Sequence, residues 1–156
     1  MRYISILAVL LIASLVLPVF AQEEKPADNM AIVRDAIRAQ KKVLIADNMQ
    51  LTETEATAFW PVYDEYQNAM KPLADRGIKM IQNYAANYEN MTDEAAGAML
   101  KEYMDIQKEQ VKIKDTYLPK FQKVLPAKKV ARYYQIENKI AAVINYDLAD
   151  QIPLVK

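Results

Sequence analysis

Two long stripes of apolar residues, spaced three and four positions apart without a break, constrain the fold more than any other feature of this sequence. The first stripe consists of Ala56, Phe59, Tyr63, Tyr66, Met70, Leu73, Gly77, Met80, Tyr84 and Tyr88. The second consists of Ala96, Met99, Tyr103, Ile106, Gln110, Ile113, Tyr117, Phe121 and Val124. Because an α-helix presents the same face every 3.6 residues, each stripe predicts one face of a helix about 50 Å long.

The rest of the chain also favours helices. Only 2 glycines and no cysteines occur, and no stretch alternates between apolar and polar residues as strands do. We therefore predict an all-α fold of four helices, over residues 29–46, 53–90, 93–124 and 126–150. The two long helices should form an elongated hairpin, and the apolar residues 152–155 should be extended because Pro153 cannot continue a helix.

Residues 1–21 have the features of a secretory signal peptide: basic Arg2, an apolar run from Ile4 to Leu17, and Val19 and Ala21 before the cleavage point. An uncleaved membrane anchor is the alternative, which the shortness of the run disfavours. We expect cleavage after Ala21, a flexible arm over residues 22–28, and one domain over residues 29–156. The mature protein is then periplasmic, without stable membrane insertion.

Helix starts are marked by capping residues. Thr52 and Glu55 form a T-x-x-E capping box, and Leu51 stands where a hydrophobic staple belongs. Thr92 can cap the third helix, although Asn90 to Thr92 also matches a glycosylation sequon. Both long helices should therefore begin directly after a threonine.

Prolines lie inside both predicted long helices. At about 100° per residue, Pro61, Pro72 and Pro119 fall on the sides opposite the apolar stripes. A helix bends away from an internal proline. The sequence therefore predicts two bowed helices whose concave faces carry aromatic and methionine side chains.

Composition argues against several classes of function. The chain has 20 basic and 20 acidic residues, so no excess of positive charge favours nucleic acid. It has no histidine and no cysteine, which disfavours haem, zinc and most nucleophilic catalysis. We expect neither enzymatic activity nor a cofactor or metal.

The apolar stripes have two interpretations. They can be core, or they can be partly wet and bind other proteins, which the abundance of tyrosine and methionine favours. Two helices alone would leave much of each stripe uncovered, which favours a homodimer or a bound partner. The candidate residues for binding unfolded proteins are Phe59, Tyr63, Tyr66, Met70, Leu73, Met80, Tyr84, Met99, Tyr103, Ile106, Tyr117 and Phe121.

The signal, the helical pattern and the motif at Leu51 and Thr52 together resemble the Spy/CpxP-like periplasmic proteins, which carry an LTxxQ motif. Glu55 stands where the motif has glutamine, and at residues 125–129 ("LPAKK") a second copy keeps only Leu125. The resemblance implies a curved antiparallel homodimer whose concave face binds unfolded or stress-damaged proteins without ATP. This sequence lacks the histidines that metal-responsive members use.

Two main functional hypotheses follow. One is an ATP-independent periplasmic chaperone, or holdase, and the other is a helical adaptor or sensor-inhibitor that binds one envelope partner. A carrier of apolar ligands is a third. Promiscuity separates the first two, because a holdase suppresses aggregation of unrelated proteins and an adaptor requires its own partner.

Overall fold

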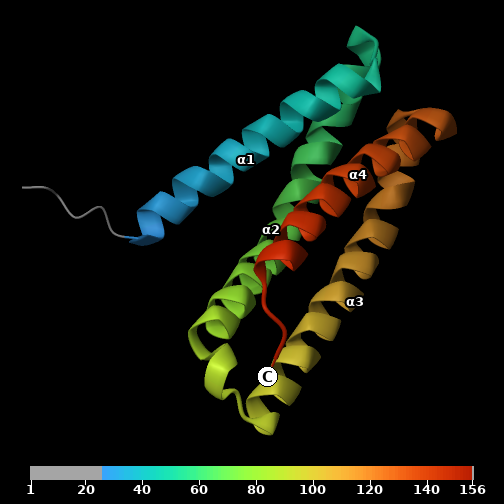
Figure 1. Ribbon diagram of the computed structural model, residues 1–156. Helices are drawn as coiled ribbons and strands as arrows, with labels where there is room; N and C mark the ends of the chain where they lie inside the picture. The colour runs from blue at the N-terminus through green and yellow to red at the C-terminus, as the bar shows by residue number, and fades with distance from the viewer. Residues whose placement is uncertain (1–25, 156) are drawn as a thin grey trace, which may run out of the picture. The chain divides into compact units, whose positions relative to one another are not determined.

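The computed structural model describes residues 26–155, and in this part of the chain it contains helices and no strands. The α-helices are α1 (Pro26–Met49), α2 (Glu53–Asn87), α3 (Asp93–Val124) and α4 (Ala127–Gln151), with a short 3-10 helix, η1 (Tyr88–Asn90), between α2 and α3 (Figure 1). The all-α prediction of four helices is confirmed. The predicted signal peptide and most of the predicted arm lie outside the described residues.

The chain divides into two units, Met1–Ala36 and Ile37–Lys156. Within the first unit, the structure describes the beginning of α1, which starts at Pro26 rather than at the predicted Asn29. The second unit contains the end of α1 and all of α2, α3 and α4. None of the helices in residues 26–155 combines the length and apolarity needed to cross a membrane.

The predicted caps of the long helices are present. The Thr52 hydroxyl accepts from the Glu55 amide at 3.3 Å, and the Glu55 carboxylate accepts from the Thr52 amide at 2.8 Å. The Thr92 hydroxyl likewise accepts from the Ala95 amide at 3.2 Å. These bonds satisfy amides that a helix start leaves unpaired, so α2 and α3 begin where the threonines predict.

The first helix continues past its predicted end at Ala46 and stops at Met49. It ends because Gln50 adopts a left-handed conformation, with φ of 50°. Two cations on α4 hold this turn: Lys129 donates to the Gln50 carbonyl at 3.0 Å, and Arg132 to the Asn48 carbonyl at 2.6 Å. The turn between α1 and α2 is therefore fixed against the start of α4.

Helices α2 and α3 pack antiparallel as a hairpin, as predicted (Figure 1). We call the end where α2 begins and α3 ends the hairpin base, and the end at η1 the hairpin tip. Helix α4 runs back along the hairpin from the base, and the extended residues 152–155 continue toward the tip. Pro61, Pro72 and Pro119 are all exposed, as their positions opposite the stripes predict.

The main core lies at the hairpin base, where four helices meet. We call it the base core, and α1, α2, α3 with the residue that follows it, and α4 all contribute to it. Its buried residues are Ile45, Met49, Phe59, Tyr63, Tyr66, Phe121, Leu125, Val130 and Tyr133. Tyr133 is central, with ring centroids 4.7 Å from Phe121 and 5.3 Å from Phe59. Offset and edge-on aromatic contacts of this kind stabilise the core beyond what burial of the ring area contributes.

Candidate functional site

Four of the twelve candidate residues belong to the base core and are not accessible to a partner in this structure. They are Phe59, Tyr63, Tyr66 and Phe121, all at most 2% exposed. The reason is α4, which places Val130 and Tyr133 over this part of both stripes. The core interpretation therefore applies at the hairpin base.

A polar network at the edge of the base core joins α1, α2 and α4. Lys41 contacts the Glu137 carboxylate at 2.8 Å and Gln67 at 3.3 Å, and Gln67 in turn donates to Glu137 at 3.4 Å. Burial, and secondarily the negative charge of Glu137, raise the pKa of Tyr63, Tyr66 and Tyr133 above the ordinary 10.0. These tyrosines are neutral core residues rather than titrating groups.

Four further candidates lie along the hairpin or against the base core. Leu73 and Ile106 are buried, and Met70 and Tyr117 are half-buried beside the base core. Tyr117 also donates to the Glu65 carbonyl at 3.3 Å. These side chains contribute to packing and present little free area.

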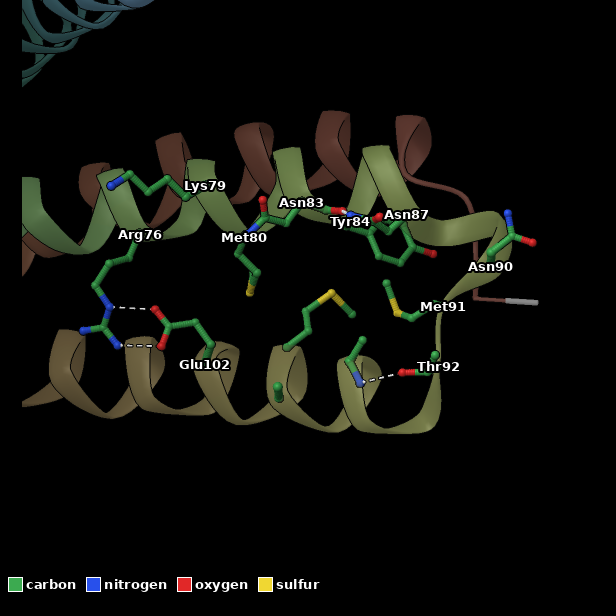
Figure 2. Close-up of a pocket in the computed structure, with 13 residues that line it drawn as sticks. Arg76, Lys79, Met80, Asn83, Tyr84, Asn87, Asn90, Met91, Thr92 and Glu102 are labelled. Atoms are coloured by element: carbon green, nitrogen blue, oxygen red, sulfur yellow. Dashed lines mark hydrogen bonds and ion pairs between the residues drawn. The ribbon is translucent and has the colours of Figure 1, made fainter.

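The remaining four candidates, Met80, Tyr84, Met99 and Tyr103, meet at the hairpin tip, where helix packing is open. Between α2 and α3 lies a hollow of about 790 Å³, which we call the interhelical hollow. Met80 and Met91 extend toward the space between the helices (Figure 2). The hollow exists because α3 begins with small residues, and Ala95 and Ala98 form part of its lining.

A second hollow of about 290 Å³ lies where residues 152–155 approach the tip, and we call it the tail hollow. On the hairpin side it is lined by Met80, Ile81, Tyr84, Met99, Leu100 and Tyr103. The Tyr84 hydroxyl donates to the Pro153 carbonyl at 2.5 Å, across 69 positions of sequence. Met80, Tyr84 and Met99 line both hollows, so these flexible or amphipathic side chains connect them.

An ion cluster bounds the interhelical hollow on the side of the base. Arg76 on α2 contacts the Glu102 carboxylate with two nitrogens, at 2.7 and 3.1 Å, and Glu109 at 2.9 Å (Figure 2 shows the Glu102 pair). The hydrogen bond from Arg76 lowers the pKa of Glu102, and both carboxylates raise that of Arg76. Arg76 and Glu102 therefore stay charged at neutral pH, and the cluster joins α2 to α3.

Three large apolar residues of the hairpin tip were not among the sequence candidates: Ile81, Leu100 and Met91. Ile81 and Leu100 lie one position beyond Met80 and Met99, outside the regular stripes, so stripe counting misses them. Leu100 is 61% exposed and Tyr103 is 47% exposed. The run of small residues at positions 95–98, opposite a methionine and a tyrosine, was the available signal.

The tip offers apolar surface rather than reactive groups. Among residues 26–155, no cluster of three or more His, Cys, Asp or Glu side chains is arranged to hold a metal ion. Comparison with protein-family models, curated proteins and solved structures found no match to this chain.

Proposed function

We propose that this protein is an ATP-independent holdase of the periplasm, and that the hairpin tip binds extended apolar segments of unfolded proteins. One observation carries the proposal. An extended apolar segment, residues 152–155, already lies at the tip beside methionine and tyrosine side chains. It is held partly through its backbone, at the Pro153 carbonyl, which every polypeptide can offer in the same way.

The side chains at the tip suit partners of varied sequence. Methionine is unbranched and adapts to irregular shapes, and Met80, Met91 and Met99 all line the hollows. Tyrosine offers apolar area with a polar end, which suits a surface that is wet in the free protein. Burial of this area by a client would contribute about 25 cal/mol per Å².

Two departures from the motif pattern of Spy/CpxP-like proteins lie at one place in the structure. Glu55, where the motif has glutamine, still forms the capping box, and it also pairs with Lys129. Lys129 lies in the segment where the second motif copy is lost, so the two departures from the family pattern contact each other. Signal cleavage and a homodimer belong to the same proposal, and intact-mass and light-scattering measurements test them.

Aggregation assays with two unrelated unfolding proteins test the holdase proposal. Tyr103→Ser combined with Leu100→Ser should weaken the suppression of both, because these exposed side chains line the tail hollow. The control is Val143→Ser, which removes an apolar side chain that is 62% exposed on α4 and lines neither hollow. Equal suppression by all three proteins, or none by the wild type, would contradict the proposal.

A second candidate function, an adaptor for one specific envelope partner, is favoured by the directional bond between Tyr84 and Pro153. Every segment has a carbonyl for this bond, but the bond fixes the position of the neighbouring side chains beside the tail hollow, so segments whose side chains fit there are preferred. The same assay separates the two functions. An adaptor would suppress the aggregation of at most one of the two unrelated proteins.

A further inference from the structure

Residues 152–155 leave α4 in a conformation suited to lie along a groove. Helix α4 ends at Gln151, and Ile152 has φ of −92° and ψ of 113°, which is extended backbone. Pro153 has no amide hydrogen, so the segment needs no acceptor at that position. Its carbonyl, in contrast, accepts from the Tyr84 hydroxyl.

The segment contacts the hairpin through a few groups only. Its four residues all lie among those that line the tail hollow, and Tyr84, which donates the hydrogen bond, is itself 6% exposed. Beyond Pro153 the contact weakens, because Leu154 is 89% exposed and Val155 is 48% exposed. A peptide with the same backbone that also buried its third side chain would gain apolar area that this segment leaves in water.

We propose that residues 152–155, which form one wall of the tail hollow, are an internal occupant of the hairpin surface that forms the other wall, and that partners of the same chemistry must displace them. The partner class is a short, extended, apolar segment with a backbone carbonyl placed for Tyr84. This proposal rests on the proposed function and adds its regulation. In the free protein, the occupant lies beside Met80, Tyr84 and Met99. Partners can bind only while it is away, so the apparent affinity for partners is proportional to the fraction of time that it is not seated.

The test uses the full chain with a weakened occupant. Ile152→Ser with Val155→Ser removes two apolar side chains of the segment and leaves the hairpin residues of the tail hollow unchanged. Val143→Ser with Tyr146→Ser is the matched control, since both side chains are exposed on α4 and line neither hollow. The far-ultraviolet circular dichroism of both variants should equal that of the wild type, because the substituted positions are exposed or beyond α4.

The probe is a fluorescein-labelled peptide of residues 148–156 ("LADQIPLVK"), followed by fluorescence anisotropy. If the occupant is seated for about 80–90% of the time, the weakened variant should bind the probe roughly five- to tenfold more tightly than the wild type. The control variant should bind like the wild type. Adding Tyr84→Phe to the weakened variant should reduce the gain, and a probe with serine in place of its isoleucine and valine should bind neither protein.

Equal affinity of wild type and weakened variant for the probe would overturn the proposal, as would an absence of binding to both. A third result would be tighter binding of the probe by the weakened variant only at high protein concentration, with equal affinities on dilution. That result would assign the seated segment to a second copy of the chain and overturn the proposal of an internal occupant.

The aggregation assay separates this outcome from that of the proposed function. Suppression by the wild type without a probe difference leaves the holdase and removes the internal occupant. If the weakened variant binds the probe more tightly but the wild type suppresses no aggregation, the internal occupant is retained and the holdase is removed.

Discussion

Single residues of the two apolar stripes have different surroundings, and two tyrosines show this most clearly. Tyr63 is 2% exposed and packs against Trp60 and Tyr133, whereas Tyr103 is 47% exposed at the tip. Tyr63→Ser should lower the free energy of unfolding by about 3–5 kcal/mol, as truncation of a core aromatic does. Tyr103→Ser should lower it by about 0.5 kcal/mol or less. Urea melts measure both values.

Tyr63→Phe is the control for this comparison. The Tyr63 hydroxyl has no hydrogen-bond partner among the described residues, so its removal should leave the stability close to that of the wild type. A loss of about 3 kcal/mol for Tyr103→Ser would place that residue in a core and would contradict the open tip.

The contact between Glu55 and Lys129 links a helix cap to α4 and predicts a pH effect. The hydrogen bond from Lys129, with that from the Thr52 amide, lowers the pKa of Glu55 below the ordinary 4.5. A lowered carboxyl pKa stabilises the folded state above the ordinary value, and this stabilisation is lost as the pH falls through the lowered value.

Glu55→Gln, which restores the residue of the LTxxQ motif, keeps the capping geometry and removes the charge. The urea midpoint of the wild type should therefore fall more steeply between about pH 5 and 3 than that of the variant. Glu53→Gln, at an exposed neighbouring position, should retain the steep dependence. Parallel pH profiles for wild type and Glu55→Gln would contradict the role of this pair.

At the scale of helices, the sequence alone predicts the number of the α-helices, their order and most of their ends. This prediction rests on local signals: the threonine caps start α2 and α3, Pro153 ends α4, and the prolines at positions 61, 72 and 119 are exposed as predicted. The end of α1 was predicted less well, because its left-handed residue is Gln50 rather than a glycine. The conformation there coincides with contacts from Lys129 and Arg132, which are remote in sequence.

The candidate site could be predicted only in part, because periodicity identifies a face of a helix but not what covers it. Phe59 and Met80 belong to the same stripe of α2, yet α4 covers the first, whereas the second borders two hollows. The length and path of α4 decide which part of the stripe stays uncovered, and periodicity in α2 does not report either. The hollow at Ala95 and Ala98 depended on packing volumes between two helices.

The internal prolines of α2 predict a gain in stability on substitution. Pro61 and Pro72 are exposed, so alanine at either position introduces no clash and restores a backbone hydrogen bond. Each substitution should raise the free energy of unfolding by about 1–3 kcal/mol. Pro126→Ala, at the cap of α4 and outside any helix interior, should give no such gain.

Aggregation assays on the double variant Pro61→Ala with Pro72→Ala address the predicted bow of α2. Suppression should fall if the bend shapes the tip for clients. Higher stability with unchanged suppression would show that the bend has no functional role.

At the scale of the whole described unit, the hairpin is packed at one end and open at the other. The base core joins four helices, while the tip contains two hollows bounded by methionine, tyrosine and alanine. A hollow of about 790 Å³ forgoes packing contacts that larger residues would make. We infer that the tip exchanges stability for open binding surface, as functional sites commonly do.

Filling the interhelical hollow tests this exchange directly. Ala98 lines the hollow, so Ala98→Leu adds apolar volume inside it and should raise the free energy of unfolding by about 0.5–2 kcal/mol. The same substitution should weaken suppression of aggregation, because the added side chain occupies space that clients would use. Ala142→Leu, at an exposed position of α4 that lines neither hollow, should change neither quantity by as much. Urea melts and aggregation assays on the same preparations measure the pair of effects. A more stable Ala98→Leu variant with undiminished suppression would remove the interhelical hollow from the binding site and leave the tail hollow alone.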